Sequence, residues 1–203
     1  MLVDTCSRQP ANSNGCSKAA WIFAAIERKK SETRLQYLAQ HDQLTDLPNR
    51  ELFHDRLRTA LARARRDGQR LAVLYLDLDQ FKPVNDNHGH DVGDLLLREV
   101  AARISQCVRD SDTVGRIGGD EFVVLLNGIS LPEHAGAVAT KIRAAVDRPF
   151  ELAGRLLQVS ASIGAAIYPD HAEDDKQLLR LADDAMYGAK RQGGNRVLMS
   201  GTT

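Results

Sequence analysis

Two adjacent acidic side chains, Asp120 and Glu121, follow a pair of glycines and precede an apolar run that ends at Leu126. Gly118 and Gly119 tolerate backbone angles that other residues avoid, so they allow the chain to reverse tightly before a strand. A strand needs such a turn, but it does not need two carboxylates there, because they repel each other. A divalent cation that carries a phosphate would offset the repulsion, and the pattern therefore indicates a metal–phosphate site.

A second pair of acids, Asp77 and Asp79, lies at the end of a nearly all-apolar segment. Because side chains alternate along a strand, these two carboxylates lie on the same side of it. Antiparallel pairing with the strand that begins at Glu121 would place Asp77 beside Asp120. Oxygen ligands of this kind suit Mg²⁺, and neither His nor Cys is placed to select a transition metal. A polar strand end with a turn cap is the alternative for Asp77 and Asp79.

Candidate contacts to phosphates and to a base lie around these acids. Lysine is a compact charge that suits phosphate oxygens, although a single lysine at a helix end is commonly a solvated charge. A carboxylate can accept hydrogen bonds from the N1–H and the exocyclic amine of guanine, and an amide can both donate and accept. Without further context, the residues favour a turn-forming Asn85 and an Asp94 that stabilises the first turn of a helix. The candidates are Lys82, Lys190 and Arg191 for phosphate, and Asn85 and Asp94 for guanine.

The bulk composition fits a globular protein with no overall charge field. The chain has 203 residues, of which 43% are hydrophobic, and its 27 basic side chains balance its 27 acidic ones. A nucleic-acid or membrane surface is therefore not an expected partner, and phosphate recognition must be local. Three scattered cysteines argue against a disulfide framework or a zinc site. The apolar stretch 19–26 is shorter than the roughly 20 residues that a bilayer requires, so we expect a cytoplasmic protein without a membrane span.

The pattern along the chain predicts an α+β domain preceded by a helix. Residues 1–17 lack periodicity and are expected to be disordered, and residues 18–40 predict a connector helix, which either self-associates or is a solvated extension. The main domain is expected over residues 41–199, with a short tail at 200–203. Helices are predicted at about 50–66, 92–108, 132–146 and 174–191, and strands at about 71–78, 121–126, 150–152, 157–168 and from 195, with a turn at 85–89.

The segments 77–82, 85–86, 89–94 and 116–122, read together, resemble the GGDEF family of diguanylate cyclases. The resemblance covers residues 41–199 with the motifs in the right order. It implies a palm-like nucleotidyl-cyclase fold with a central five-stranded, mostly antiparallel sheet. It also implies that two GTP molecules are condensed into cyclic di-GMP with release of pyrophosphate.

The resemblance also implies a role for individual residues. Asp77, Asp120 and the backbone carbonyl of Leu78 would bind Mg²⁺, for which Mn²⁺ could substitute. Asp120 would also help to deprotonate the attacking hydroxyl, as part of a catalytic set that it forms with Glu121 and Lys82. Asn85 and Asp94 would read guanine, His90 would lie close to the nucleotide, and Lys82 and Lys190 would bind phosphates.

Two further features concern regulation. The segment 109–112 matches the inhibitory motif of the family, which implies that Arg109 and Asp112 bind cyclic di-GMP; a charged loop after a helix is the alternative. Because one domain holds one GTP, activity is expected to require a homodimer, controlled through the helix at 18–40 by an upstream sensor domain or protein.

One position departs from the family. The chain has Gly194 where the family often has an arginine that reaches phosphate, and Arg191 or Arg196 would have to substitute. This departure mildly favours the second hypothesis, a regulatory module that binds GTP or cyclic di-GMP with little turnover. The intact Asp120–Glu121 pair favours an enzyme.

Overall fold

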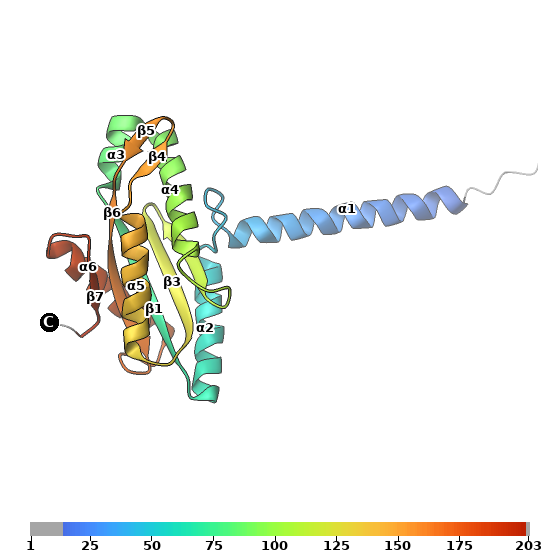
Figure 1. Ribbon diagram of the computed structural model, residues 1–203. Coiled ribbons are helices and arrows are strands. Elements are labelled where there is room, and N and C mark those ends of the chain that lie inside the picture. The colour runs from blue at the N-terminus through green and yellow to red at the C-terminus, as the bar shows by residue number, and fades with distance from the viewer. Residues whose placement is uncertain (1–13, 202–203) are drawn as a thin grey trace, which may run out of the picture. The chain divides into compact units, whose positions relative to one another are not determined.

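The computed structural model describes residues 14–201 and divides the chain into two units, 1–39 and 40–203, which we describe separately. Helix α1 (Asn14–Gln40) accounts for the described part of the first unit (Figure 1). The apolar side chains of Trp21, Ile22 and Phe23 in this helix are exposed. The prediction of disorder over 1–17 is wrong for 14–17, which are helical, and its remainder lies outside the described residues. Between residues 14 and 201, no helix has the length and apolar character that a membrane span requires.

A five-stranded sheet forms the centre of the second unit, in the order β2-β3-β1-β6-β7 (Figure 1). All neighbouring strands run antiparallel except β6 and β7, which are parallel. The predicted α+β fold with a mostly antiparallel sheet is therefore confirmed. The strands are β1 (Arg70–Asp79), β2 (Thr113–Gly118), β3 (Glu121–Ile129), β6 (Ser160–Tyr168) and β7 (Val197–Met199).

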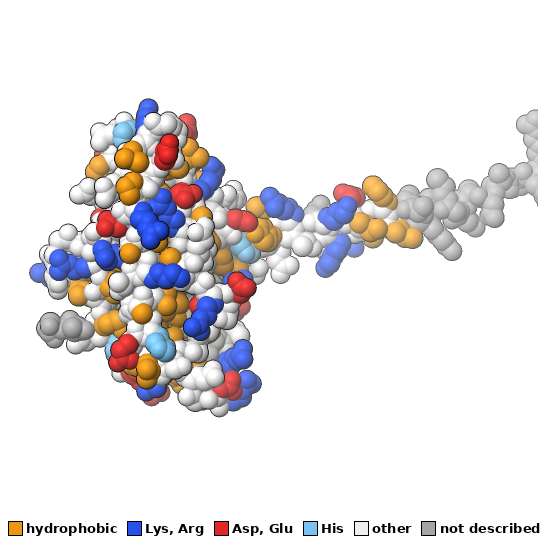
Figure 2. Space-filling model, viewed as in Figure 1, with side chains coloured by type: hydrophobic (Ala, Val, Ile, Leu, Met, Phe, Trp, Pro, Cys, Tyr) orange, Lys and Arg blue, Asp and Glu red, His pale blue; other side chains and the backbone are white. Residues whose placement is uncertain are grey.

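Helices cover both faces of this sheet, which explains why β1 is apolar along almost its whole length. On one face, α2 (Arg50–Asp67) and α6 (Asp175–Arg191) pack on the side chains of Leu71, Val73 and their neighbours. On the other, α4 (His90–Ser105) and α5 (Pro132–Val146) pack on alternate residues such as Leu74 and Leu76. Acidic and basic side chains are interspersed over the face of this unit that Figure 2 shows, in keeping with the balanced composition.

Two predicted elements differ from the structure. The segment predicted as a turn at 85–89 is largely the helix α3 (Phe81–His88), because Gln80 adopts a positive φ of 61° and turns the chain directly from β1 into a helix. The strand predicted at 157–168 is two strands. Its first residue belongs to β5 (Arg155–Leu157), which pairs with β4 (Phe150–Leu152) in a separate two-stranded sheet. The turn of that hairpin has two residues with positive φ, Ala153 and Gly154, as tight hairpins require.

Local signals fix the helices that border the site. The side chain of Asn49 caps α2 by accepting a hydrogen bond from the Leu52 N–H at 3.1 Å. On α6, contact with the sheet is so close that a Cβ on Gly164 of β6 would overlap the backbone of Ala182 and Met186. This close contact fixes the distance between α6 and the sheet, and it therefore fixes the position of Lys190 in the last turn of the helix.

Candidate functional site

The pairing of β1 with β3 brings the acidic residues of both strands to one edge of the sheet. Asp77 is directly opposite Glu121 in the antiparallel register. Asp120 lies in the turn between β2 and β3, and its carbonyl accepts a hydrogen bond from the Leu78 N–H at 3.3 Å. The tight turn that the two glycines allow therefore places the Asp120–Glu121 pair against the end of β1, as the sequence predicted.

Asp77 is the most buried carboxylate of this group, with 9% of the residue exposed. Its Oδ1 atom is buried and forms an ion pair with Lys190, whose Nζ lies 2.5 Å away. Burial raises the pKa of Asp77, and the charges of Asp120 and Glu121 raise it further, against the opposing effect of Lys190. A cation beside Asp77 would relieve both the burial of an ionised group and the repulsion.

The donors at this edge fit a magnesium ion that shares its coordination with a substrate. Asp77 and Asp120 offer carboxylate oxygens, and the hydrogen bond from the Leu78 N–H to the Asp120 carbonyl holds the backbone of Leu78 at the same edge. Over residues 14–201, no three His, Cys, Asp or Glu side chains gather closely enough to enclose a metal by themselves. Mg²⁺ is typically held by one or two carboxylates, with waters and phosphate oxygens completing its octahedron.

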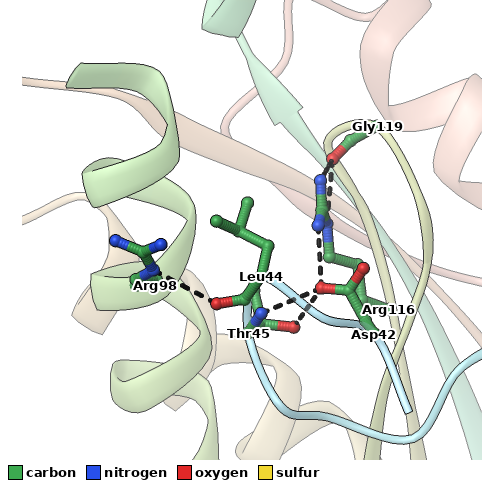
Figure 3. A network of polar contacts seen from close by, with 6 residues as sticks. All are labelled: Asp42, Leu44, Thr45, Arg98, Arg116 and Gly119. Carbon is green, nitrogen blue, oxygen red and sulfur yellow. Dashed lines mark hydrogen bonds and ion pairs between the residues drawn. The ribbon is translucent and has the colours of Figure 1, made fainter. Parts of the chain in front are cut away.

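A network of polar contacts fixes the tip of the β2–β3 turn to the segment that precedes α2 (Figure 3). Arg116 donates to the Gly119 carbonyl from Nε at 3.1 Å and from Nη2 at 2.6 Å, and its Nη1 lies 2.8 Å from Oδ1 of Asp42. That same oxygen accepts from the N–H and hydroxyl of Thr45. Although burial raises the pKa of Asp42, the hydrogen bonds from Thr45 and Arg116 lower it below its ordinary value. Sequence reasoning missed this pair, because the two residues lie 74 positions apart, although Arg116 belongs to the segment 116–122.

A second group that the sequence did not reveal lies on the α2–α6 face of the sheet. The hydroxyl of Tyr75 donates to Oε2 of Glu121 at 3.2 Å. Burial raises the pKa of Tyr75, as do the charges of Glu121 and Asp183, so the hydroxyl keeps its proton at neutral pH. Burial also raises the pKa of Asp183, and Glu121 adds to this effect. Tyr75 and Asp183 line a cavity of about 300 Å³ together with Arg50, His54, Ile117, Lys176, Leu179 and Arg180.

The candidate guanine ligands meet where α3 joins α4. Asn85 lies in α3, and its side chain packs so closely on Gly93 of α4 that a Cβ there would overlap the amide oxygen. Asp94 is the next residue of α4, while His90 begins that helix. Lys82 is exposed in the first turn of α3. The helical α3 thus presents Asn85 and Asp94 at one junction, which a turn at 85–89 would not have done.

Asp79 has a structural role in this protein. Its carboxylate accepts hydrogen bonds from the hydroxyls of Ser160 and Ser162, both at 2.7 Å, and from the Asn195 N–H at 2.9 Å. Gly194 adopts a φ of +71° against this carboxylate, where a Cβ would lie 3.1 Å from its atoms. Arg196 donates to the Gly194 carbonyl at 3.3 Å. The loop that departs from the family motif is therefore held by Asp79.

The candidate inhibitory residues lie in the loop between α4 and β2. One carboxylate oxygen of Asp112 accepts from the Arg109 N–H at 3.1 Å, and the other accepts from the Asn127 N–H at 3.0 Å. The side chain of Arg109 is exposed. Asp112 thus shapes the loop, whereas Arg109 is free to contact a ligand from solvent.

Comparisons with known proteins agree with this geometry. Residues 39–196 match the family model described as "Diguanylate cyclase, GGDEF domain". The chain belongs to the GGDEF family of diguanylate cyclases. It is 46% identical to diguanylate cyclase TpbB of Pseudomonas aeruginosa over 81% of its own length and 38% of that protein. The solved coiled coil and GGDEF domain of DgcB from Caulobacter crescentus, in complex with c-di-GMP, is 30% identical with a TM-score of 0.80, over 90% of this chain and 97% of that one.

Another similar protein is named for two enzymatic activities. The chain is 48% identical to MucR of Pseudomonas aeruginosa, a bifunctional diguanylate cyclase/cyclic di-GMP phosphodiesterase, over 84% of its own length and 25% of that protein. The GGDEF chain thus spans between a quarter and two fifths of the length of these two curated relatives. The matched region contains the acids of β1 and β3 and the guanine candidates of α3 and α4.

Proposed function

We propose that this GGDEF domain condenses two molecules of GTP into cyclic di-GMP, with Mg²⁺ or Mn²⁺ as the metal. The observation that carries the proposal is the meeting of Asp77, Asp120 and Glu121 at one sheet edge, beside the ammonium group of Lys190. Three acids and one base at the end of a buried strand suit a metal-bound triphosphate. The family and the relative named diguanylate cyclase support the same reaction.

The residues divide the chemistry between them. Asp77, Asp120 and the Leu78 carbonyl would hold the metal, which when bound supplies a Lewis acid for the α-phosphate. Asp120 would accept the proton of a 3′-hydroxyl, and Lys82 and Lys190 would bind phosphate oxygens. The 3′-oxygen of one GTP attacks the α-phosphorus of the other, the bond to the β-phosphate oxygen breaks, and pyrophosphate leaves. A second such transfer closes the ring.

Base selection would fall to the junction of α3 and α4. There, Asp94 would accept from the N1–H and exocyclic amine of guanine, while the amide of Asn85 would donate and accept. Adenine has an acceptor at N1 and no amine at C2, so the Asp94 carboxylate would be left without donors when ATP is bound. His90, one helical turn before Asp94, would lie next to the nucleotide.

Two domains are needed for the reaction, since each would present one GTP to the other. We infer that a homodimer is the active form and that α1 transmits a signal from an upstream sensor domain or protein to it. The exposed apolar side chains of α1, among them Trp21 and Ile22, support an association role for this helix. Cytoplasmic GTP would supply the substrate.

Feedback inhibition is proposed to act through Arg109 and Asp112. The exposed guanidinium of Arg109 would bind a phosphate or guanine edge of cyclic di-GMP. Because Asp112 also holds the loop through Asn127, Arg109→Ala is the better variant for this test. It should raise the product concentration that half-inhibits the enzyme while leaving the initial rate unchanged.

Purified protein with GTP and Mg²⁺ provides the direct test of the enzymatic proposal. The wild type should release pyrophosphate and cyclic di-GMP, Asp120→Asn should lose more than about 100-fold of this rate, and specific activity should fall on dilution. Glu133→Gln, which removes one negative charge from the exposed first turn of α5, is the matched control and should be fully active. Equal product from wild type and Asp120→Asn, or none from either, would overturn the proposal.

A further inference from the structure

Glu121 is surrounded by negative charge on the α2–α6 face of the sheet. Asp77 is its partner across the β1–β3 ladder, and Asp183 of α6 lines the cavity beside Tyr75. The charge of Glu121 raises the pKa of both carboxyl groups. Lys190 pairs with Asp77, whereas Glu121 accepts a hydrogen bond from a neutral donor, the hydroxyl of Tyr75, at 3.2 Å from Oε2. The hydrogen bond from Tyr75 and the repulsion from the two acids therefore both act on the direction in which the Glu121 carboxylate points.

The position of Tyr75 follows from the register of the sheet. Tyr75 precedes Asp77 by two residues, so both side chains lie on the same face of β1. Tyr75 is paired with Val123 and Asp77 with Glu121, which makes Tyr75 the diagonal neighbour of Glu121. An aromatic side chain is long enough to contact a diagonal neighbour on the adjacent strand. The hydroxyl of a tyrosine lies at the end of its ring and can therefore bond to such a neighbour.

The cavity beside Tyr75 offers Glu121 a competing environment. Its lining includes three cationic side chains and one acidic one, together with Tyr75 itself: Arg50, Lys176, Arg180 and Asp183. A carboxylate that turned toward these cations would be attracted to them and would leave the edge where Asp77 and Asp120 lie. A hydroxyl can hold the carboxylate without neutralising it, whereas an ion pair with an arginine would compete with a metal for the same charge.

We propose that Tyr75 is a positioning residue for the metal–phosphate site: its hydroxyl keeps the Glu121 carboxylate turned toward Asp77 and away from the cationic cavity. The inference rests on the proposed function, because it assigns Glu121 to that site. It adds a residue that is outside the acidic motif and that acts only through Glu121. Tyr75→Phe removes the hydroxyl and leaves the packing of the half-buried ring in place.

The test compares Tyr75→Phe with Tyr168→Phe. Tyr168 lies on the same face at the other end of the sheet, so its variant controls for the loss of a hydroxyl. With Tyr75→Phe we expect kcat to fall about tenfold, KM for GTP to stay within about twofold, and the Mg²⁺ concentration for half-maximal activity to rise several-fold. With Tyr168→Phe all three should match the wild type. Unchanged kcat and Mg²⁺ dependence in a folded Tyr75→Phe protein would overturn the inference.

A binding measurement separates this inference from the proposed function. Calorimetric titration of Mn²⁺ into protein saturated with a non-hydrolysable GTP analogue should give a several-fold weaker Kd for Tyr75→Phe than for Tyr168→Phe. In a Glu121→Gln background, Tyr75→Phe should have no further effect on the Mn²⁺ affinity, because its action passes through Glu121. A wild type that makes no product overturns the proposed function alone. An equal Mn²⁺ affinity in all the tyrosine variants overturns the positioning role alone.

Discussion

Replacing Arg116 by methionine should loosen the turn that carries the acidic pair. The guanidinium of Arg116 bridges the Gly119 carbonyl and the Asp42 carboxylate, and only 10% of its side chain is exposed (Figure 3). Methionine keeps most of the side-chain volume and loses every donor. The variant therefore isolates the polar bridge between the β2–β3 turn and the segment before α2.

The size of the effect follows from the contacts that are lost. A hydrogen bond that involves a charged group contributes about 1.5–3 kcal/mol, and an acceptor left unsatisfied in a partly buried place costs more than one that water reaches. Asp42 keeps its two hydrogen bonds from Thr45 and is 25% exposed, which limits the loss on that side. We expect Arg116→Met to lower the free energy of unfolding by about 2–4 kcal/mol, or Tm by roughly 10 °C.

A double-mutant cycle with Asp42→Asn measures the pair itself. Chemical denaturation of the four proteins at pH 7 should give a coupling energy of about 1.5–3 kcal/mol. The folded pKa of Asp42 lies below its unfolded value, so the ionised pair contributes fully above the unfolded pKa of about 3.9. As the pH falls from there through the folded pKa, that contribution is lost, and the coupling should shrink toward zero.

Activity at 25 °C provides the functional side of the same experiment. If the bridge holds Asp120 against β1, Arg116→Met should lower kcat by about tenfold under conditions where the protein remains folded. A coupling energy below about 0.5 kcal/mol at pH 7, or one that persists undiminished at pH 3, would refute this reading of the pair. A folded variant with wild-type kcat would show that the bridge stabilises the turn without positioning its acids.

Three other substitutions test the surrounding structure. Asp77→Asn should abolish activity yet leave the Tm of the metal-free protein at pH 7 unchanged or higher. The pKa of Asp77 is raised in the folded state, so its ionisation destabilises the fold as the pH rises, and Lys190 can be hydrated once its ion pair with Asp77 is lost. A large fall in Tm would contradict this. Asn49→Ala should cost about 1 kcal/mol through loss of the α2 cap, seen as a Tm lower by about 2–4 °C. Gly164→Ala should cost more than about 3 kcal/mol, since its Cβ would overlap the Ala182 backbone; a small change in denaturation midpoint would show that α6 can move away.

Strong local signals explain why much of the fold could be predicted from sequence. The apolar run of β1 and the tight turn at Gly118 and Gly119 each allow few local structures. The turn joins β2 to β3, whereas the antiparallel pairing of β1 with β3 joins segments that are distant in the chain and was a hypothesis from the sequence. The prediction that Asp77 lies beside Asp120 required only that pairing. The helix α3 was missed because Asn85 and its neighbours favour turns, whereas the structure forms the helix from an unusual positive φ at Gln80.

Contacts between distant segments could not be predicted in the same way. The bond of Tyr75 to Glu121 depends on the diagonal register of two strands, and that of Arg116 to Asp42 joins residues 74 positions apart. Neither pair has a spacing or composition that marks it in the chain. Such pairs became visible only when the strands and the segment before α2 were placed in three dimensions.

The two acids of β1 show how position decides the role of identical side chains. Asp77 and Asp79 lie on the same side of the strand, two residues apart, and both could have been metal ligands by sequence. Asp79 is satisfied by two serine hydroxyls and the Asn195 N–H, so its charge is already used to hold the C-terminal loop. The buried oxygen of Asp77 is instead paired with the ammonium group of Lys190, 2.5 Å away. We therefore propose that a metal would bind at Asp77 and Asp120 rather than at Asp79, and that a cation in this place would leave Lys190 available to bind phosphate.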